Sequence, residues 1–140
     1  MFYPAHFEPA EEGGFVVTFP DLPEGITQGD TYEEAMEMAE DVLISCVEIY
    51  FDEEKPFPAP QKFKKGEEAV FLPDSIYAKV LLHNTILDKK VSKAELARLT
   101  TIRPPEIQRI LTPKHNTKID TISRIMAKIG NPISLVISHQ

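Results

Sequence analysis

The fold of the C-terminal half is decided by one stretch, SKAELARLTTIRPPEIQRIL, which runs from Ser92 to Leu111. Ser92 and Glu95 have the spacing of a capping box, in which both side chains accept backbone N–H groups at the start of a helix. Pro104 and Pro105 can occupy the first turn of a second helix, where their missing N–H groups cost little. The stretch therefore predicts two short helices joined by a tight turn.

The apolar residues of this stretch have the spacing of a helix-turn-helix motif. Ala97 is followed by Ile102, Ile107 and Ile110 at five, ten and thirteen positions. Two helices that cross steeply leave room only for a small residue such as Ala97 at their contact. The isoleucines close the underside, so the outer face of the second helix is free to enter a DNA major groove. Glycine usually occupies the turn position held by Thr101, so we expect a slightly altered turn.

Basic and polar side chains follow on the expected outer face. Arginine can bridge O6 and N7 of guanine and glutamine can bridge N6 and N7 of adenine, whereas lysine near a helix start suits phosphate. The candidate DNA-binding residues are Arg103, Gln108, Arg109, Lys114, His115 and Lys118. The alternative is that these are ordinary surface charges on a small helical bundle. Capping, core spacing and basic charge together favour DNA binding.

Two helices and a strand complete the C-terminal half. One helix begins at Asp74 or Ser75, and its inner face is formed by Ile76, Val80, Leu81 and either Asn84 or Leu87. The other begins near Thr117 and ends at Gly130, with inward residues Ile119, Ile122, Ile125, Met126 and Ile129. The segment from Ile133 to Ser138 predicts a C-terminal strand, which needs a partner. Because such motifs read paired half-sites about 34 Å apart, we expect a homodimer through this domain; pairing of dimers into a tetramer stays open.

The N-terminal half predicts a small antiparallel sheet covered by one helix. Alternating residues from Phe2 to Phe7, the turn at Gly13-Gly14 and the run from Phe15 to Phe19 predict a hairpin. The prolines at 20 and 23 end its second strand. A short third strand is expected near Ile26-Thr27-Gln28, and the apolar run at residues 69–72 predicts a last strand of the same sheet.

A second capping box begins the helix that covers this sheet. Thr31 and Glu34 have the spacing of this capping box. Apolar residues then recur at spacings of three and four, which predicts a helix from about Tyr32 to Phe51. Cys46 lies on the apolar face, which favours a buried and inert thiol. The fold class is thus α+β, followed by an all-α helix-turn-helix domain with a C-terminal strand. We place the domains at residues 1–72, with a proline-rich connector near 52–66, and at residues 73–140.

Charge separates the two halves. Residues 1–72 contain 4 Lys and Arg against 17 Asp and Glu, a formal charge of −13, whereas residues 73–140 contain 11 against 5, a charge of +6. Such asymmetry indicates two surfaces with opposite preferences for partners.

Over nearly its full length the chain resembles the HicB-type antitoxins. The resemblance rests on these segments: Tyr3-Pro4, Glu12-Gly13-Gly14-Phe15, Phe19-Pro20-Asp21-Leu22-Pro23, Thr27-Gln28-Gly29-Asp30-Thr31, Glu34-Ala35, Pro56 to Pro60, Glu95-Leu96-Ala97-Arg98 and Thr117-Lys118-Ile119-Asp120. It implies a partial ribonuclease-H-like N-terminal domain that binds and blocks a HicA-type mRNA-cleaving toxin. It also implies a C-terminal domain that represses the toxin–antitoxin operon by binding operator DNA.

An acidic helix face fits such a toxin, because a protein that cleaves RNA must attract a polyanion. The candidate toxin-binding residues are Glu33, Glu37, Glu40 and Asp41. The alternative function is a small-molecule-responsive repressor without a toxin partner. A ligand that shifts DNA affinity would favour it.

Enzymatic activity is not expected. Two-metal hydrolysis needs several converging carboxylates, and the candidates Asp21 and Asp30 lie in turn-rich sequence where Asp commonly bonds its own backbone. No His/Cys metal spacing stands out, so neither a metal nor another cofactor is expected. A single cysteine and the lack of an apolar run of about 20 residues favour a cytoplasmic protein without a membrane segment.

Overall fold

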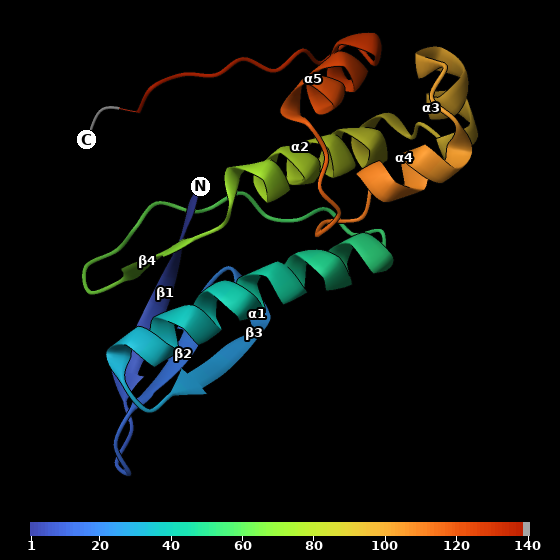
Figure 1. The fold of residues 1–140 in the computed structure, drawn as a ribbon. Coiled ribbons are helices and arrows are strands. Elements are labelled where there is room, and N and C mark those ends of the chain that lie inside the picture. Colours follow the sequence, from blue (N-terminus) through green and yellow to red (C-terminus); the bar gives the residue numbers. More distant parts are fainter. Residues whose placement is uncertain (139–140) are drawn as a thin grey trace.

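The computed structural model describes residues 1–138 of the 140-residue chain. A small sheet and a long helix come first, and four shorter helices follow (Figure 1). The elements are β1 (Phe2–Pro9), β2 (Phe15–Phe19), β3 (Leu22–Gly29), α1 (Tyr32–Asp52), β4 (Glu68–Phe71), α2 (Asp74–Lys89), α3 (Lys93–Thr100), α4 (Pro104–Ile110) and α5 (Ile119–Lys128). The predicted α+β class is confirmed.

The sheet has four antiparallel strands in the order β3-β2-β1-β4. The predicted hairpin is present: Phe7 pairs with Val17, and both turn glycines adopt positive φ, +96° at Gly13 and +75° at Gly14. Glycine suits these positions because a side chain would strain the left-handed backbone. The strand expected near residue 26 is longer than predicted, since β3 already begins at Leu22. Pro23 is tolerated there because β3 lies at an edge of the sheet.

Helix α1 covers one face of the sheet, as the sequence predicted (Figure 1). The Thr31 hydroxyl accepts the N–H of Glu34 at 3.1 Å, which is the first half of the capping box. The Glu34 carboxylate accepts the N–H of Asp30 at 3.3 Å, one residue before the cap. The face toward the sheet is formed by Ala35, Ala39, Leu43, Cys46 and Val47. Cys46 is buried as predicted, and burial raises the pKa of its thiol to about 11, which disfavours the reactive thiolate.

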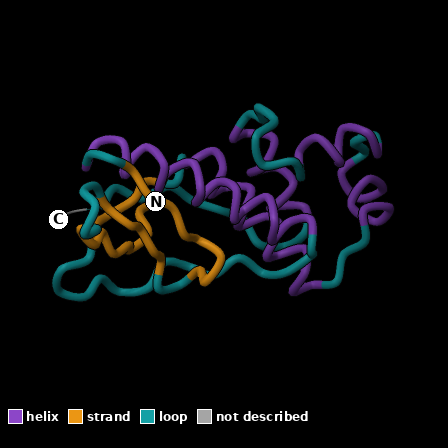
Figure 2. The backbone as a smooth tube through the Cα atoms, turned by 90° about the horizontal axis from the view of Figure 1, so that it is seen from below, coloured by secondary structure: helices purple, strands orange, loops and turns teal. Residues whose placement is uncertain are grey.

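The buried side chains form two clusters, and α2 contributes to both. Ile76 and Val80 join the first cluster with the sheet and α1, whereas Ala78 and Leu82 join the second with α3, α4 and α5. Figure 2 shows the strands gathered at one end of the molecule and the short helices at the other. The molecule therefore has two cores arranged along one shared helix.

The connector between α1 and β4 has no regular secondary structure, as expected. It is nevertheless held against α2 by hydrogen bonds and a buried side chain. Phe57 is only 1% exposed, and its backbone N–H and carbonyl both hydrogen-bond the Asn84 side chain at 2.9 Å. Nε2 of His83 contacts the Lys55 carbonyl oxygen at 2.7 Å, and its ring stacks on Phe51 with centroids 4.0 Å apart. These five residues are called the latch below. The latch joins the end of α1 and the connector to the middle of α2.

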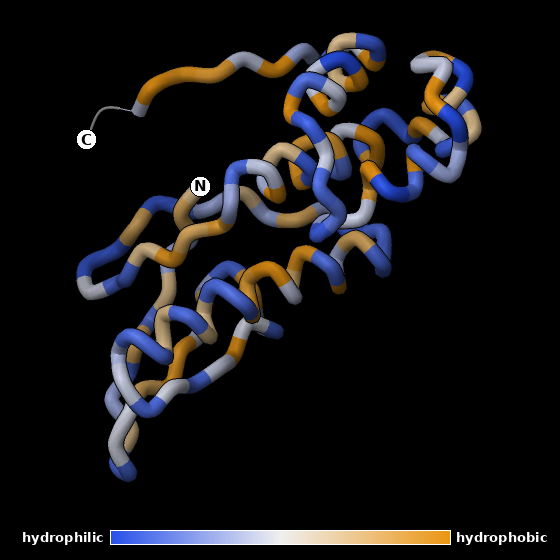
Figure 3. The backbone as a smooth tube through the Cα atoms, viewed as in Figure 1, coloured by the Kyte–Doolittle hydropathy of each residue, from blue (hydrophilic) through white to orange (hydrophobic). Residues whose placement is uncertain are grey.

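Three expectations about apolar residues need correction. Leu82, not Leu81, is the fully buried leucine of α2, and Leu81 is half-buried. Ile119 is 42% exposed because it is the first residue of α5 and lies beyond the contact with α2. The expected C-terminal strand is absent from the described chain: residues 131–138 form no strand, and Leu135 is 87% exposed. A strand needs the N–H and carbonyl groups of a neighbour, and none lies beside this extended apolar tail (Figure 3).

The latch generates a prediction for stability. Replacing Phe57 with alanine removes a buried ring that contacts Tyr3 and Tyr50, so unfolding should become easier by about 3–5 kcal/mol. Phe63 lies in the same connector but is 41% exposed, so Phe63→Ala is the matched control and should change stability by about 0.5 kcal/mol or less. Urea unfolding followed by circular dichroism compares the two variants. Equal destabilisation would contradict the structural role of Phe57.

Candidate nucleic-acid interface

Helices α3 and α4 form the motif that the sequence predicted. The Ser92 hydroxyl accepts the N–H of Glu95 at 3.0 Å and caps α3. Leu96, Ile107 and Ile110 are each 1% exposed and form the underside of the pair. Of the expected core, Ile107 and Ile110 are therefore fully buried, whereas Ala97 and Ile102 are half-buried and pack against the same cluster.

The turn between the two helices is not altered by the missing glycine. Thr101 adopts φ +58° and ψ +17°, the left-handed conformation that glycine would adopt without strain. Its hydroxyl donates a hydrogen bond to the carbonyl oxygen of Thr100 at 2.6 Å. The expected change in the turn is thus wrong, because threonine accepts the strained backbone at this position.

The exposed side of α4 carries the residues expected to read bases. Arg103 is the N-cap residue of α4 and is exposed, as are Gln108 and Arg109. With about 100° of rotation per residue, Gln108 and Arg109 lie opposite the buried Ile107 and Ile110. Arg109 forms an exposed ion pair with Glu106, three residues earlier on the same helix, at 2.6 Å.

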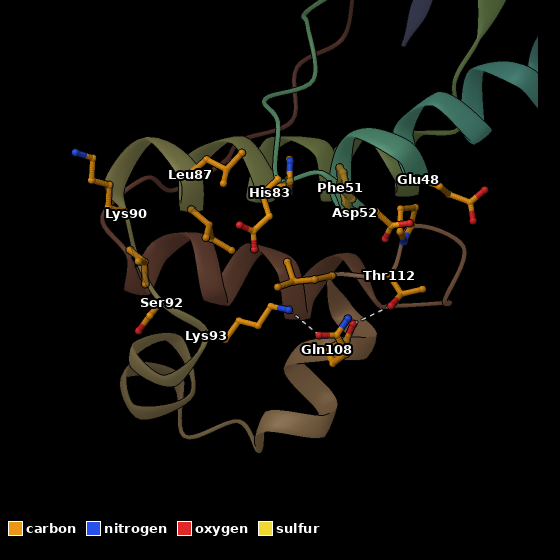
Figure 4. Close-up of a pocket in the computed structure, with 15 residues that line it drawn as sticks. Glu48, Phe51, Asp52, His83, Leu87, Lys90, Ser92, Lys93, Gln108 and Thr112 are labelled. Carbon is orange, nitrogen blue, oxygen red and sulfur yellow. Dashed lines mark hydrogen bonds between the residues drawn. The ribbon is translucent and has the colours of Figure 1, made fainter. Parts of the chain in front are cut away.

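Lys93 belongs to this surface, although the sequence did not single it out. Its Nζ donates a hydrogen bond to Oε1 of Gln108 at 2.7 Å and so links the start of α3 to α4 (Figure 4). Its position directly after the Ser92 cap was the available signal, because the first turn of the first helix borders the second helix in such a motif.

The loop between α4 and α5 carries the remaining candidates, and these do not all point the same way. His115 and Lys118 are exposed, and Lys118 is the N-cap residue of α5. Lys114, in contrast, forms an ion pair with Glu48 of α1 at 3.5 Å. The structure therefore directs one predicted DNA-binding residue toward the acidic N-terminal part.

A buried lysine holds this loop in place. Lys79 of α2 is 1% exposed, and its Nζ donates hydrogen bonds to the carbonyl oxygens of Thr112 and His115. Burial lowers the pKa of Lys79 from its usual value to about 8. The carbonyls lie just after α4, where a cation also interacts favourably with the helix dipole. The only signal for this role in the sequence is the inward position of Lys79 between Ile76 and His83 at helical spacing.

The predicted toxin-binding residues lie together on the outer side of α1. Glu33, Glu37 and Asp41 are exposed and Glu40 is half-buried. Among the residues that the structure describes, none of these carboxylates forms an ion pair. They are therefore available to a cationic surface.

Of the two aspartates considered for catalysis, Asp21 uses its carboxylate in a structural hydrogen bond, whereas Asp30 is exposed and is bonded through its backbone N–H. Oδ2 of Asp21 accepts the N–H of Gln61 in the connector at 3.3 Å. Asp30 lies before α1, and its N–H bonds the Glu34 side chain. Within residues 1–138, no three His, Cys, Asp or Glu side chains gather in a metal-binding arrangement. No helix in that range is long and apolar enough to cross a membrane.

A groove of about 800 Å³ separates the end of α1 from the helix-turn-helix. One wall is formed by Glu48, Asp52 and Glu54 around the end of α1. The opposite wall includes Lys93 and Gln108 (Figure 4). The latch residues Phe51 and His83 line the groove together with Ile86 and Leu87 of α2 and with Leu111, the residue directly after α4.

Comparisons with known proteins agree with this arrangement. Residues 2–81 match the family described as "HicB_like antitoxin of bacterial toxin-antitoxin system". The chain is 49% identical to Antitoxin HicB 2 of Photorhabdus laumondii over 97% of this chain and 96% of that protein. It is 44% identical to Antitoxin HicB 1 of the same organism, over 98% of this chain and 87% of the relative. It is 38% identical to Antitoxin HicB of Escherichia coli K12, over 97% of this chain and 99% of the relative. The chain therefore belongs to the HicB-like family of antitoxins of bacterial toxin–antitoxin systems.

Proposed function

We propose that this antitoxin neutralises a HicA-type toxin through its N-terminal part and represses its own operon through the helix-turn-helix. The observation that carries the DNA-binding half is the exposed side of α4, where Arg103, Gln108 and Arg109 lie above a fully buried underside. Family membership favours this function over the alternative of a small-molecule-responsive repressor without a toxin.

The toxin-binding half of the proposal rests on charge. A toxin that cleaves RNA needs a cationic surface for its substrate, and the unpaired carboxylates on the outer side of α1 are complementary to such a surface. An antitoxin that covers this surface would exclude RNA from it.

The DNA-binding half predicts the effect of truncating the reading face. The variant Arg103→Ala/Gln108→Ala/Arg109→Ala should lose about 100-fold or more in affinity for its own promoter duplex, since each bidentate base contact contributes roughly 1–3 kcal/mol. A matched control is Arg124→Ala/Lys128→Ala, which removes the same positive charge from exposed positions of α5. Fluorescence anisotropy with labelled promoter DNA measures both. Undiminished retention of DNA by the triple variant would overturn the DNA-binding proposal.

The toxin-binding half predicts a salt-dependent loss of affinity. Neutralising Glu33, Glu37, Glu40 and Asp41 to their amides should weaken the toxin complex about 10-fold at low ionic strength and less near 0.15 M, where the Debye length falls to about 8 Å. The control neutralises Glu8, Glu11, Glu12 and Asp88, which are exposed and lie away from the α1 face. Calorimetric titration with the purified toxin compares them. An unchanged affinity would reject electrostatic docking on α1.

The exposed tail supports assembly through the C-terminal part. Leu135, Val136 and Ile137 are each more than 80% exposed in the single chain, and pairing with a second copy would cover them. A chain ending at Asn131 should therefore be monomeric and should bind paired half-sites weakly. Sedimentation of this chain beside the complete one measures the change. Dimers that survive the truncation would refute assembly through the tail; whether dimers pair into tetramers would appear in the same experiment on the complete chain.

A further inference from the structure

The end of α1 brings negative charge to the surface proposed to meet DNA. Glu48, Asp52 and Glu54 form one wall of the groove described above and are called the acidic rim. Asp52 and Glu54 are exposed, and Glu48 is half-buried. The other wall is formed by Lys93 and Gln108, and Gln108 lies beside Arg109 on the exposed side of α4 (Figure 4).

One residue connects the acidic rim directly to the expected phosphate contacts. Nζ of Lys114 lies 3.5 Å from Oε1 of Glu48, within ion-pair distance. A lysine that pairs with a carboxylate contributes less to a phosphate contact, because its charge is already partly neutralised and its side chain is oriented elsewhere. Glu48 therefore competes with DNA for Lys114.

The acidic rim cannot easily move away from the helix-turn-helix. Phe51, between Glu48 and Asp52 in the sequence, stacks on His83 at 4.0 Å. Lys55, directly after Glu54, has its carbonyl oxygen 2.7 Å from Nε2 of the same histidine. Because His83 belongs to α2, which is part of the helix-turn-helix core, the latch holds the acidic rim at a set distance from α3 and α4.

We infer that the acidic rim of the N-terminal part weakens DNA binding by the helix-turn-helix, by repelling the phosphate backbone and by holding Lys114. The inference rests on the proposed DNA-binding function and adds residues that lower affinity to those that raise it. Repulsion of this kind acts within about one Debye length, about 10 Å at 0.1 M salt, so it is strongest at low ionic strength.

Charge-neutral variants test the inference. Glu48→Gln/Asp52→Asn/Glu54→Gln should bind the promoter duplex about three- to tenfold more tightly than the unmodified protein at 50 mM salt, with a smaller gain at 200 mM. The matched control is Glu8→Gln/Glu11→Gln/Glu12→Gln, which changes net charge equally at exposed positions at the end of β1 and in the hairpin turn. The control should stay within about twofold of the unmodified protein, because its carboxylates do not line the groove.

The outcomes separate this inference from the proposed function. If both triple variants gain affinity equally, net charge explains the effect and the acidic rim has no special role. If the unmodified protein binds DNA and the rim variant binds no more tightly, the inference is wrong while the proposed function stands. If no form binds the promoter, DNA binding itself is refuted. Glu48→Gln alone, which frees Lys114 with a single isosteric change, should give part of the gain and guards against misfolding of the triple variant.

Discussion

The side chain of Asn84 closes two hydrogen bonds on the backbone of one connector residue, Phe57, and the relation between the two halves depends on this contact. Without it, the connector N–H and carbonyl would be buried without partners, which costs about 1–3 kcal/mol for each group. With it, α1, the connector and α2 form one body. The acidic face of α1 and the basic side of α4 therefore have a defined relation, which a flexible linker would not give them.

Local signals in the sequence were sufficient for the elements. The caps at Thr31 and Ser92 and the periodicity of apolar residues predicted α1, α3 and α4 closely, because a cap and the face behind it are encoded within one turn of helix. The same reasoning failed at Ile119 and in the tail, where periodicity or β-propensity indicates a buried face but does not say which neighbour covers it.

The relations between distant residues could not be predicted in this way. The sequence pattern can place Asn84 and Lys79 on the inner side of α2 but cannot name their partners, which are the connector for Asn84 and the loop after α4 for Lys79. Contacts across 27 to 36 positions depend on the tertiary fold, and no local pattern encodes them. The same is true of the candidate site. The spacing of the helix-turn-helix motif predicts Arg103, Gln108 and Arg109, whereas only the structure shows the contact of Lys93 with Gln108 and the ion pair of Lys114.

The sharing of α2 by both cores has a consequence for how such chains can be recombined. A chimera joined at Leu72 would place a foreign α2 against Phe57 and so lose the histidine and amide that receive the connector. A chimera joined after Lys89 would keep the connector contacts but would pack a native helix against foreign α3 and α5 partners. Neither junction separates two independent modules, so the proposed DNA-reading surface is easier to exchange by substitution on α4 than by transplanting the whole C-terminal part.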